Sequence, residues 1–126
     1  MGHVAGTADE IRARVPPVLE AWAFMRDNVL RGGIVDPDLK RLCFRYLAED
    51  PDVMDFERFD GRERVALEWA HAIAWDSDAA DDALWERLHE EFTDAELVEL
   101  GCAIGFALGQ QHWERTLGLP AQAGIS

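Results

Sequence analysis

The feature that most restricts the fold of this chain is a set of three glycines inside a long run of helix-forming residues. Gly101, Gly105 and Gly109 recur every four residues in the segment 93–118, which opens with the capping box Thr93-x-x-Glu96. A glycine in a helix interior costs about 1 kcal/mol relative to alanine. The spacing places all three on one face, so we expect that face to pack closely against another backbone. A cavity is expected where the glycines stop and His112 begins.

The remainder of the chain is also predicted to be helical. Capping signals, prolines and apolar residues at helical spacing predict a short helix from Thr7, then helices over 16–31, from Pro37 to before Pro51, 60–75 and 78–91. No alternating strand pattern is present. The length of 126 residues indicates one domain. We therefore expect an all-α, single-domain bundle of five or six helices, with residues 1–8 and 120–126 flexible.

The charge of the chain restricts its partners. It carries 25 acidic and 12 basic residues, a net charge of −13. Such a chain repels phosphate backbones and anionic lipid surfaces, so we predict no nucleic-acid partner and no membrane partner. The longest apolar stretch, 100–108, is too short to span a bilayer, and the N-terminus has no signal pattern. These features favour a cytoplasmic protein.

The two cysteines, Cys43 and Cys102, are far apart in the sequence, and each lies among apolar residues of a predicted helix. We expect two reduced, buried thiols that act as small hydrophobic side chains. A lone reactive thiol at Cys43 is the alternative, because Arg41 and Arg45 are near enough in sequence to lower its pKa.

Four segments in order resemble motifs of the carboxymuconolactone decarboxylase and AhpD-like alkylhydroperoxidase superfamily. They cover about two-thirds of the chain. Residues 33–42 (GIVDPDLKRL) are similar to the opening L-D-P-x-L-K-E-L, and residues 59–70 (FDGRERVALEWA) to F-t-x-R-E-x-A-A-L-x-x-A. Residues 92–100 (FTDAELVEL) resemble F-s-d-x-E-L-V-E-L, and 115–119 (RTLGL) the terminal R-x-x-x-x-L-G-L/I. The resemblance implies the helical fold and a homo-oligomer, a trimer or hexamer.

The chain differs from that superfamily at the residues that carry out the peroxidase reaction. Peroxidase members carry a glutamate in the third-helix motif, followed about a dozen residues later by a C-x-H-C or C-x-x-C pair. Here Arg41 stands at the glutamate position, and the segment 48–58 contains neither cysteine nor histidine. The resemblance therefore implies a divergent member that lacks the cysteine pair and has no thiol peroxidase activity.

His112 and Arg115 are the centre of the predicted site. They lie one turn apart, so an arginine that holds an anionic group and a histidine that moves a proton can share one ligand. We expect Glu68 and His71 to face this site from the fourth helix. The predicted catalytic residues are thus His112, Glu68 and His71, and the predicted substrate-binding residues are Arg115, Trp113 and Trp69.

This constellation predicts a protein that binds or transforms a small organic molecule, with anionic molecules among the candidates, without a cofactor. Any enzyme activity would be decarboxylase-like or isomerase-like acid–base chemistry. The alternative is a non-catalytic structural or interaction subunit, in which the same groups satisfy one another at a helix contact. The five tryptophans fit both interpretations, since aromatic side chains fill cores and interfaces and also line pockets for planar ligands.

A metal-binding bundle is a second alternative. Glu68-x-x-His71 and Glu86-x-x-His89 both place two ligands on one helix face, and Glu20 and Glu99 are available to complete a di-metal site. However, the two motifs lie on consecutive helices, and chance matches are expected in a chain so rich in charge. We therefore predict no metal.

Overall fold

The computed structural model describes residues 3–119, and within them the chain contains helices and loops but no strand. This confirms the predicted all-α fold. The α-helices are α1 (Ala8–Arg12), α2 (Pro16–Met25), α3 (Pro37–Leu47), α4 (Gly61–Trp75), α5 (Asp82–Glu91) and α6 (Asp94–Thr116). A π-helical turn, η1 (Arg26–Leu30), follows α2, and the short 3-10 turns are η2 (Pro51–Val53), η3 (Phe56–Arg58) and η4 (Ser77–Ala79).

Local sequence signals explain most helix ends. Thr7 and Thr93 each form the predicted capping box with the glutamate three residues later. Asp36 caps α3 by accepting a hydrogen bond from the backbone N–H of Asp38. The fifth helix begins at Asp82, later than expected, because residues 77–79 form a separate 3-10 turn and Asp81 supplies the cap.

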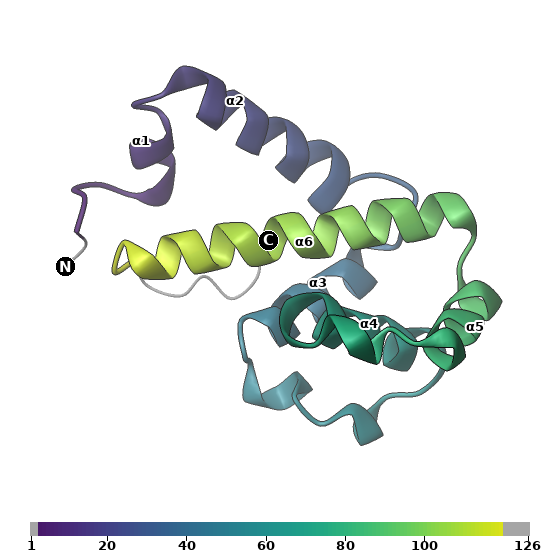
Figure 1. Cartoon of the computed structure of the whole chain (residues 1–126). Coiled ribbons are helices and arrows are strands. Elements are labelled where there is room, and N and C mark those ends of the chain that lie inside the picture. Colours follow the sequence, from purple (N-terminus) through teal and green to yellow (C-terminus); the bar gives the residue numbers. More distant parts are fainter. Residues whose placement is uncertain (1–2, 120–126) are drawn as a thin grey trace.

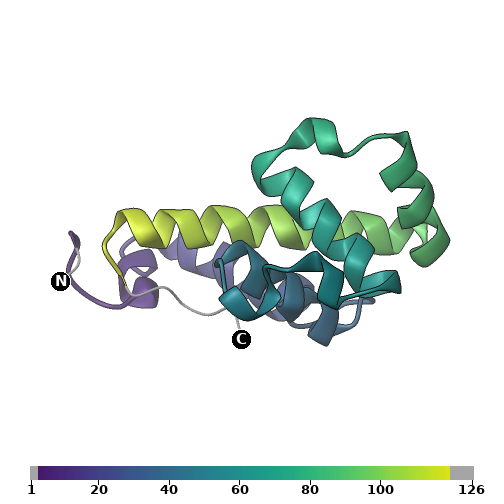
Figure 2. The same ribbon diagram turned by 90° about the horizontal axis from the view of Figure 1, so that it is seen from below.

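Helix α6 is the element on which the others assemble. Figure 1 shows α1 and α2 along one side of α6, α3 and α4 along the other, and α5 near the end where α6 begins. In the view from below, α6 runs along the length of the molecule (Figure 2). The core between these helices contains fully buried side chains from α3, α4, α5 and α6, among them Phe44, Leu67, Leu88, Leu100 and Ile104.

A buried ion pair joins α3, α6 and the loop between α2 and α3. Lys40 is 0% exposed, and its Nζ lies 2.9 Å from a carboxylate oxygen of Glu99. The Lys40 ammonium also donates hydrogen bonds to the carbonyls of Val29 and Gly32, both at 2.6 Å. Glu99 accepts hydrogen bonds from the backbone N–H groups of Ile34 and Val35. Both charges are therefore compensated, as buried ions require.

Arg12 anchors the N-terminal helices to the end of α6. Its side chain is almost fully buried, donates to Gln110 and lies 3.5 Å from a carboxylate oxygen of Glu114. Its guanidinium also lies over the rings of Trp22 and Trp113, at 3.9 Å and 4.9 Å from their centroids. Helix α1 is therefore held by packing and charge together.

The predicted flexible ends fall partly outside the described residues, since residues 1–2 and 120–126 are not described. Within the described part, the backbone N–H of His3 donates to the carbonyl of Leu117 at 2.7 Å, and Ala8 is buried. His3 is therefore tied to the residue that caps the end of α6, and Ala8 packs into the interior.

The three glycines of α6 do not share one environment. A Cβ at Gly101 would lie 2.9 Å from Cη2 of Trp69 on α4, so this glycine does permit a close approach. A Cβ at Gly105 or Gly109 would meet no atom within 4 Å. The expectation of a tightly packed glycine face is therefore correct within the subunit only at Gly101. A four-residue step on a helix of 3.6 residues per turn rotates by about 40°, which carries the later glycines away from α4.

Candidate functional site: a tryptophan-lined pocket

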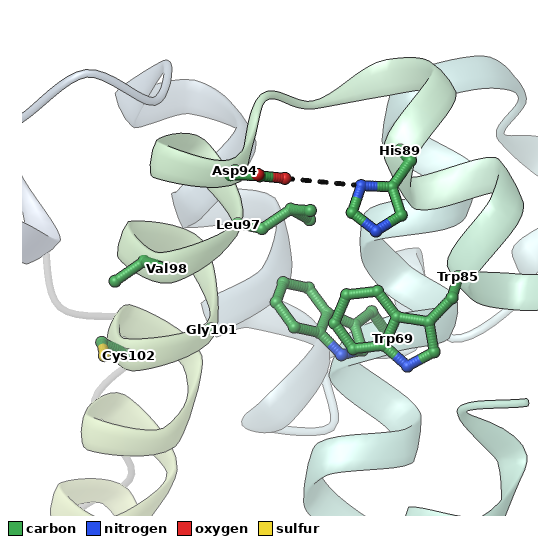
Figure 3. Close-up of a pocket in the computed structure, with 8 residues that line it drawn as sticks. All are labelled: Trp69, Trp85, His89, Asp94, Leu97, Val98, Gly101 and Cys102. Carbon is green, nitrogen blue, oxygen red and sulfur yellow. Dashed lines mark ion pairs between the residues drawn. The ribbon is translucent and has the colours of Figure 1, made fainter.

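An apolar pocket of about 500 Å³ opens between α4, α5 and the first half of α6. We call it the tryptophan pocket. Figure 3 shows its lining residues, which are Trp69, Trp85, His89, Asp94, Leu97, Val98, Gly101 and Cys102. The pocket lies at the first glycine of α6, whereas the sequence predicted a cavity beyond the last. Nearly all of its accessible lining is apolar, so its surface is suited to an apolar ligand.

Two indole rings form one wall of this pocket. The centroids of Trp69 and Trp85 are 5.5 Å apart, and the ring planes meet at 68°, an edge-to-face arrangement that aromatic pairs favour. Trp69 lies against α6 only because position 101 has no Cβ. Gly101 therefore sets the depth of the pocket by letting the indole approach the helix backbone.

Polar groups are confined to the rim of the tryptophan pocket. His89 Nδ1, at the end of α5, lies 3.6 Å from Asp94 Oδ1, at the start of α6, and both side chains are exposed (Figure 3). The apolar interior and this rim pair together fit an organic molecule with a flat apolar body and a polar end.

Glu68 and His71, two of the predicted catalytic residues, line a second and smaller pocket of about 250 Å³. Its other lining residues come from η3, η4, Asp81 and helix α5, and none comes from α6. Glu68 is ion-paired with Arg87 and lies 3.5 Å from Arg64. Its charge is therefore already compensated within the subunit.

His71 is joined to Tyr46 on α3. The tyrosine hydroxyl lies 2.8 Å from Nδ1 of His71. Burial raises the pKa of Tyr46 above its usual value, which keeps the phenol protonated. The pair is positioned between α3 and α4 beside the rings of Phe56 and Trp75.

The other predicted site residues lie near the end of α6. His112 is exposed and makes no hydrogen bond or ion pair with another of residues 3–119. Arg115 is 3.7 Å from Glu49 across the gap to α3, and Trp113 packs against Arg12. Among these predicted residues, only Trp69 lines the tryptophan pocket. The pocket that contains Glu68 and His71 receives no residue from α6, so it does not include His112.

The two cysteines differ in their exposure to solvent. Cys43 is fully buried on α3, and burial raises the pKa of its thiol to about 12, as expected for an inert core side chain. Cys102 is exposed on α6, so the prediction that both thiols are buried is wrong for Cys102. The apolar neighbours of Cys102 in sequence point inward, whereas its own position falls on the outer side of the helix.

Within residues 3–119, no three or more histidine, cysteine, aspartate or glutamate side chains form a group that could hold a metal ion. Of the four glutamates named for a di-metal site, two are held in ion pairs and two are exposed on the surface. Glu99 binds Lys40 and Glu68 binds Arg87, while Glu20 and Glu86 are exposed.

Sequence reasoning named Trp69 as a binding residue, Gly101 as a position of close packing and His89 as a candidate metal ligand, but it did not place the three in one pocket. Trp85, Leu97, Val98 and Cys102 were not distinguished from core residues. One signal was available for two of them: Val98 and Cys102 are apolar residues four apart on the outward side of α6, where polar residues are usual.

Comparison of the chain with protein-family models, with curated proteins and with solved structures finds no significant match. The resemblance to the carboxymuconolactone decarboxylase and AhpD-like superfamily therefore remains a hypothesis that rests on the four motifs. Among residues 3–119, no helix has the length and apolar character needed to cross a bilayer.

Proposed function

We propose that this protein binds a small organic molecule with a flat, apolar body in the tryptophan pocket. One observation carries the proposal: a pocket of about 500 Å³ whose accessible lining is nearly all apolar and includes two indoles. A pocket of this size is typical of small-molecule sites. His89 and Asp94 at the rim supply the groups for recognition of a polar end or for acid–base chemistry.

The same proposal retains the interpretation of the chain as a divergent AhpD-like protein of the cytoplasm that assembles as a homo-oligomer. The proposed function does not include thiol peroxidase activity. The buried Cys43 is held as the thiol by its high pKa, and a peroxidase needs a thiolate with a second sulfur within reach. We expect no hydroperoxide consumption in the presence of a dithiol reductant. Turnover that disappears in a Cys43→Ser, Cys102→Ser variant would contradict this expectation.

Titration with N-phenyl-1-naphthylamine tests the pocket. This probe is neutral, planar and apolar, and its fluorescence rises when it leaves water. We expect saturable binding of one equivalent per chain. Trp85→Ala removes one wall and should weaken binding about tenfold, the scale of a lost aromatic contact together with its apolar area.

Trp75→Ala is the matched control for this titration. Trp75 is 42% exposed and does not line the tryptophan pocket, so the same change of residue should leave probe affinity unaltered. Absence of saturable binding to the parent protein, or equal losses in the two variants, would mean that the site is wrong.

A further inference from the structure

The outward side of α6 carries a straight row of five exposed residues, none of which is an Asp, Glu, Lys or Arg. Val98, Cys102, Gly105, Gly109 and His112 follow one another at alternating steps of four and three residues. All five are exposed, and Val98 is 68% exposed. We call this row the outer strip. Steps that average 3.5 residues keep a row nearly straight along a helix, which is the pattern of a seam between two packed helices.

The outer strip is free of formal charge in a strongly acidic protein. Residues 100–113 contain no Asp, Glu, Lys or Arg, although 29% of the whole chain is charged. Two copies of a chain with a net charge of −13 repel each other most weakly where neither presents a carboxylate. A second copy is therefore the occupant that this face accommodates best.

Apolar openings lie on both sides of the outer strip. The tryptophan pocket adjoins it through Val98 and Cys102. On the other side, Phe106 and Gln110 of α6 line a pocket with Val18 and Trp22 of α2. A helix seated on the strip lies between these two pockets and can contact the rim of each.

We propose that two copies of this chain pair their α6 helices in antiparallel fashion along the outer strip, with the two-fold axis at Gly105. The acidic start of α6 selects the direction. Asp94, whose side chain is 95% exposed, lies at that start. A parallel pair would bring the two acidic starts together, whereas the antiparallel pair separates them and aligns the helix dipoles in opposite directions.

This register makes each tryptophan pocket a two-subunit site. Val98 lies seven residues before Gly105 and His112 lies seven residues after it, so the two meet across the axis. Val98 is part of the pocket wall. The His112 of a second copy therefore reaches the mouth of the tryptophan pocket, where it can bind the polar end of a ligand. This part of the inference rests on the proposed function, since it assumes that the pocket binds a ligand.

Multi-angle light scattering between about 1 and 100 μM tests the pairing. We expect a dimer, or a larger assembly of dimers, because a two-fold contact gives even-numbered states. Gly105→Leu should shift the protein to monomer and leave its far-ultraviolet circular dichroism unchanged, since position 105 is exposed and a Cβ there meets no atom within 4 Å. The control Ala83→Leu, on an exposed position of α5, should leave the assembly intact. A parent that is monomeric or only trimeric would overturn the proposal.

A cysteine at the axis tests the location directly. In a Cys102→Ser background, Gly105→Cys places two thiols opposite each other across the proposed axis, and mild oxidation should link the copies covalently. Ala83→Cys in the same background should remain largely unlinked. Equal cross-linking of both variants, or none in Gly105→Cys, would overturn the proposed contact.

Complementation tests the shared site. The probe 1-anilinonaphthalene-8-sulfonate adds an anionic group to the aromatic body. Trp85→Ala and His112→Ala should each bind it at least several-fold more weakly than the parent. A refolded equal mixture should recover about a quarter of the parent sites, because half of the dimers then contain one intact pocket. No recovery in the mixture, with dimers still formed, would overturn the shared site. Failure of the neutral probe to bind the parent would instead refute the proposed function and leave the pairing to be decided by light scattering.

Discussion

At the residue scale, the buried pair Lys40–Glu99 shows how one charge can hold several elements together. Burial raises the pKa of Glu99, but hydrogen bonds from Val35, Lys40 and Ile34 outweigh it, so the pKa lies below its usual value. Glu99→Gln should lower the free energy of unfolding by about 3 kcal/mol or more, because the ammonium of Lys40 would remain buried without its partner. Urea denaturation measures this loss.

The control for that variant is Glu86→Gln, which changes an exposed helical glutamate and should stay within about 0.5 kcal/mol of the parent. The pH dependence has a defined sign. A carboxylate whose pKa is lowered by folding stabilises the native state above its unfolded pKa, and this contribution is lost as the pH falls through the folded pKa. The difference in stability between parent and Glu99→Gln should therefore shrink in acid. A constant difference down to acid pH would contradict this account.

The two thiols provide a second prediction at this scale. Cys102→Ser leaves only Cys43, which is fully buried and has a pKa of about 12. We expect no reaction of the folded variant with 5,5′-dithiobis(2-nitrobenzoate) at neutral pH and one equivalent of reaction after denaturation. A thiol that reacts in the folded state would show that Cys43 is the reactive residue after all.

At the element scale, α6 shows what a helix pattern can and cannot predict. Its capping box and its length were predicted from Thr93, Glu96 and the following apolar residues, because those signals are local. The environment of each glycine could not be predicted. Each four-residue step rotates the next glycine by about 40° around the helix, and its neighbours are known only when the positions of α4 and α2 are known. The arrangement of the site residues could not be predicted for the same reason. Whether His112 on α6 and Glu68 on α4 face each other depends on how the two helices pack, which local sequence signals do not determine.

Alanine substitutions at Gly105 and Gly101 should have different effects on the free energy of unfolding. Gly105→Ala should stabilise the isolated subunit by about 1 kcal/mol, because alanine is the better helix former and its Cβ meets nothing. Gly101→Ala gains the same propensity but forces the ring of Trp69 away from α6, so it should be neutral or destabilising. Urea melts at protein concentrations below the dimer range compare the two. Equal stabilisation by both substitutions would contradict the packing described at Trp69.

At the scale of the whole molecule, the net charge of −13 acts against compactness. Salt screens this self-repulsion, since the Debye length falls from about 20 Å at 20 mM to about 8 Å at 150 mM ionic strength. We expect the Tm to rise by a few degrees over that range. The measurement should use Gly105→Leu, which separates screening within a subunit from screening between subunits. A Tm that falls with added salt would show that attractive ion pairs dominate instead.

The contacts of Arg12 have a consequence for the order in which the protein forms during synthesis. Its partner Gln110 lies 98 residues further along the chain. Helix α1 has only five residues, too few for a helix to be stable alone in water. The N-terminal segment therefore has no stable position until the ribosome has released most of α6. Until then the nascent chain presents residues 8–12 to proteases, and the docking of α1 waits for α6, which is made much later.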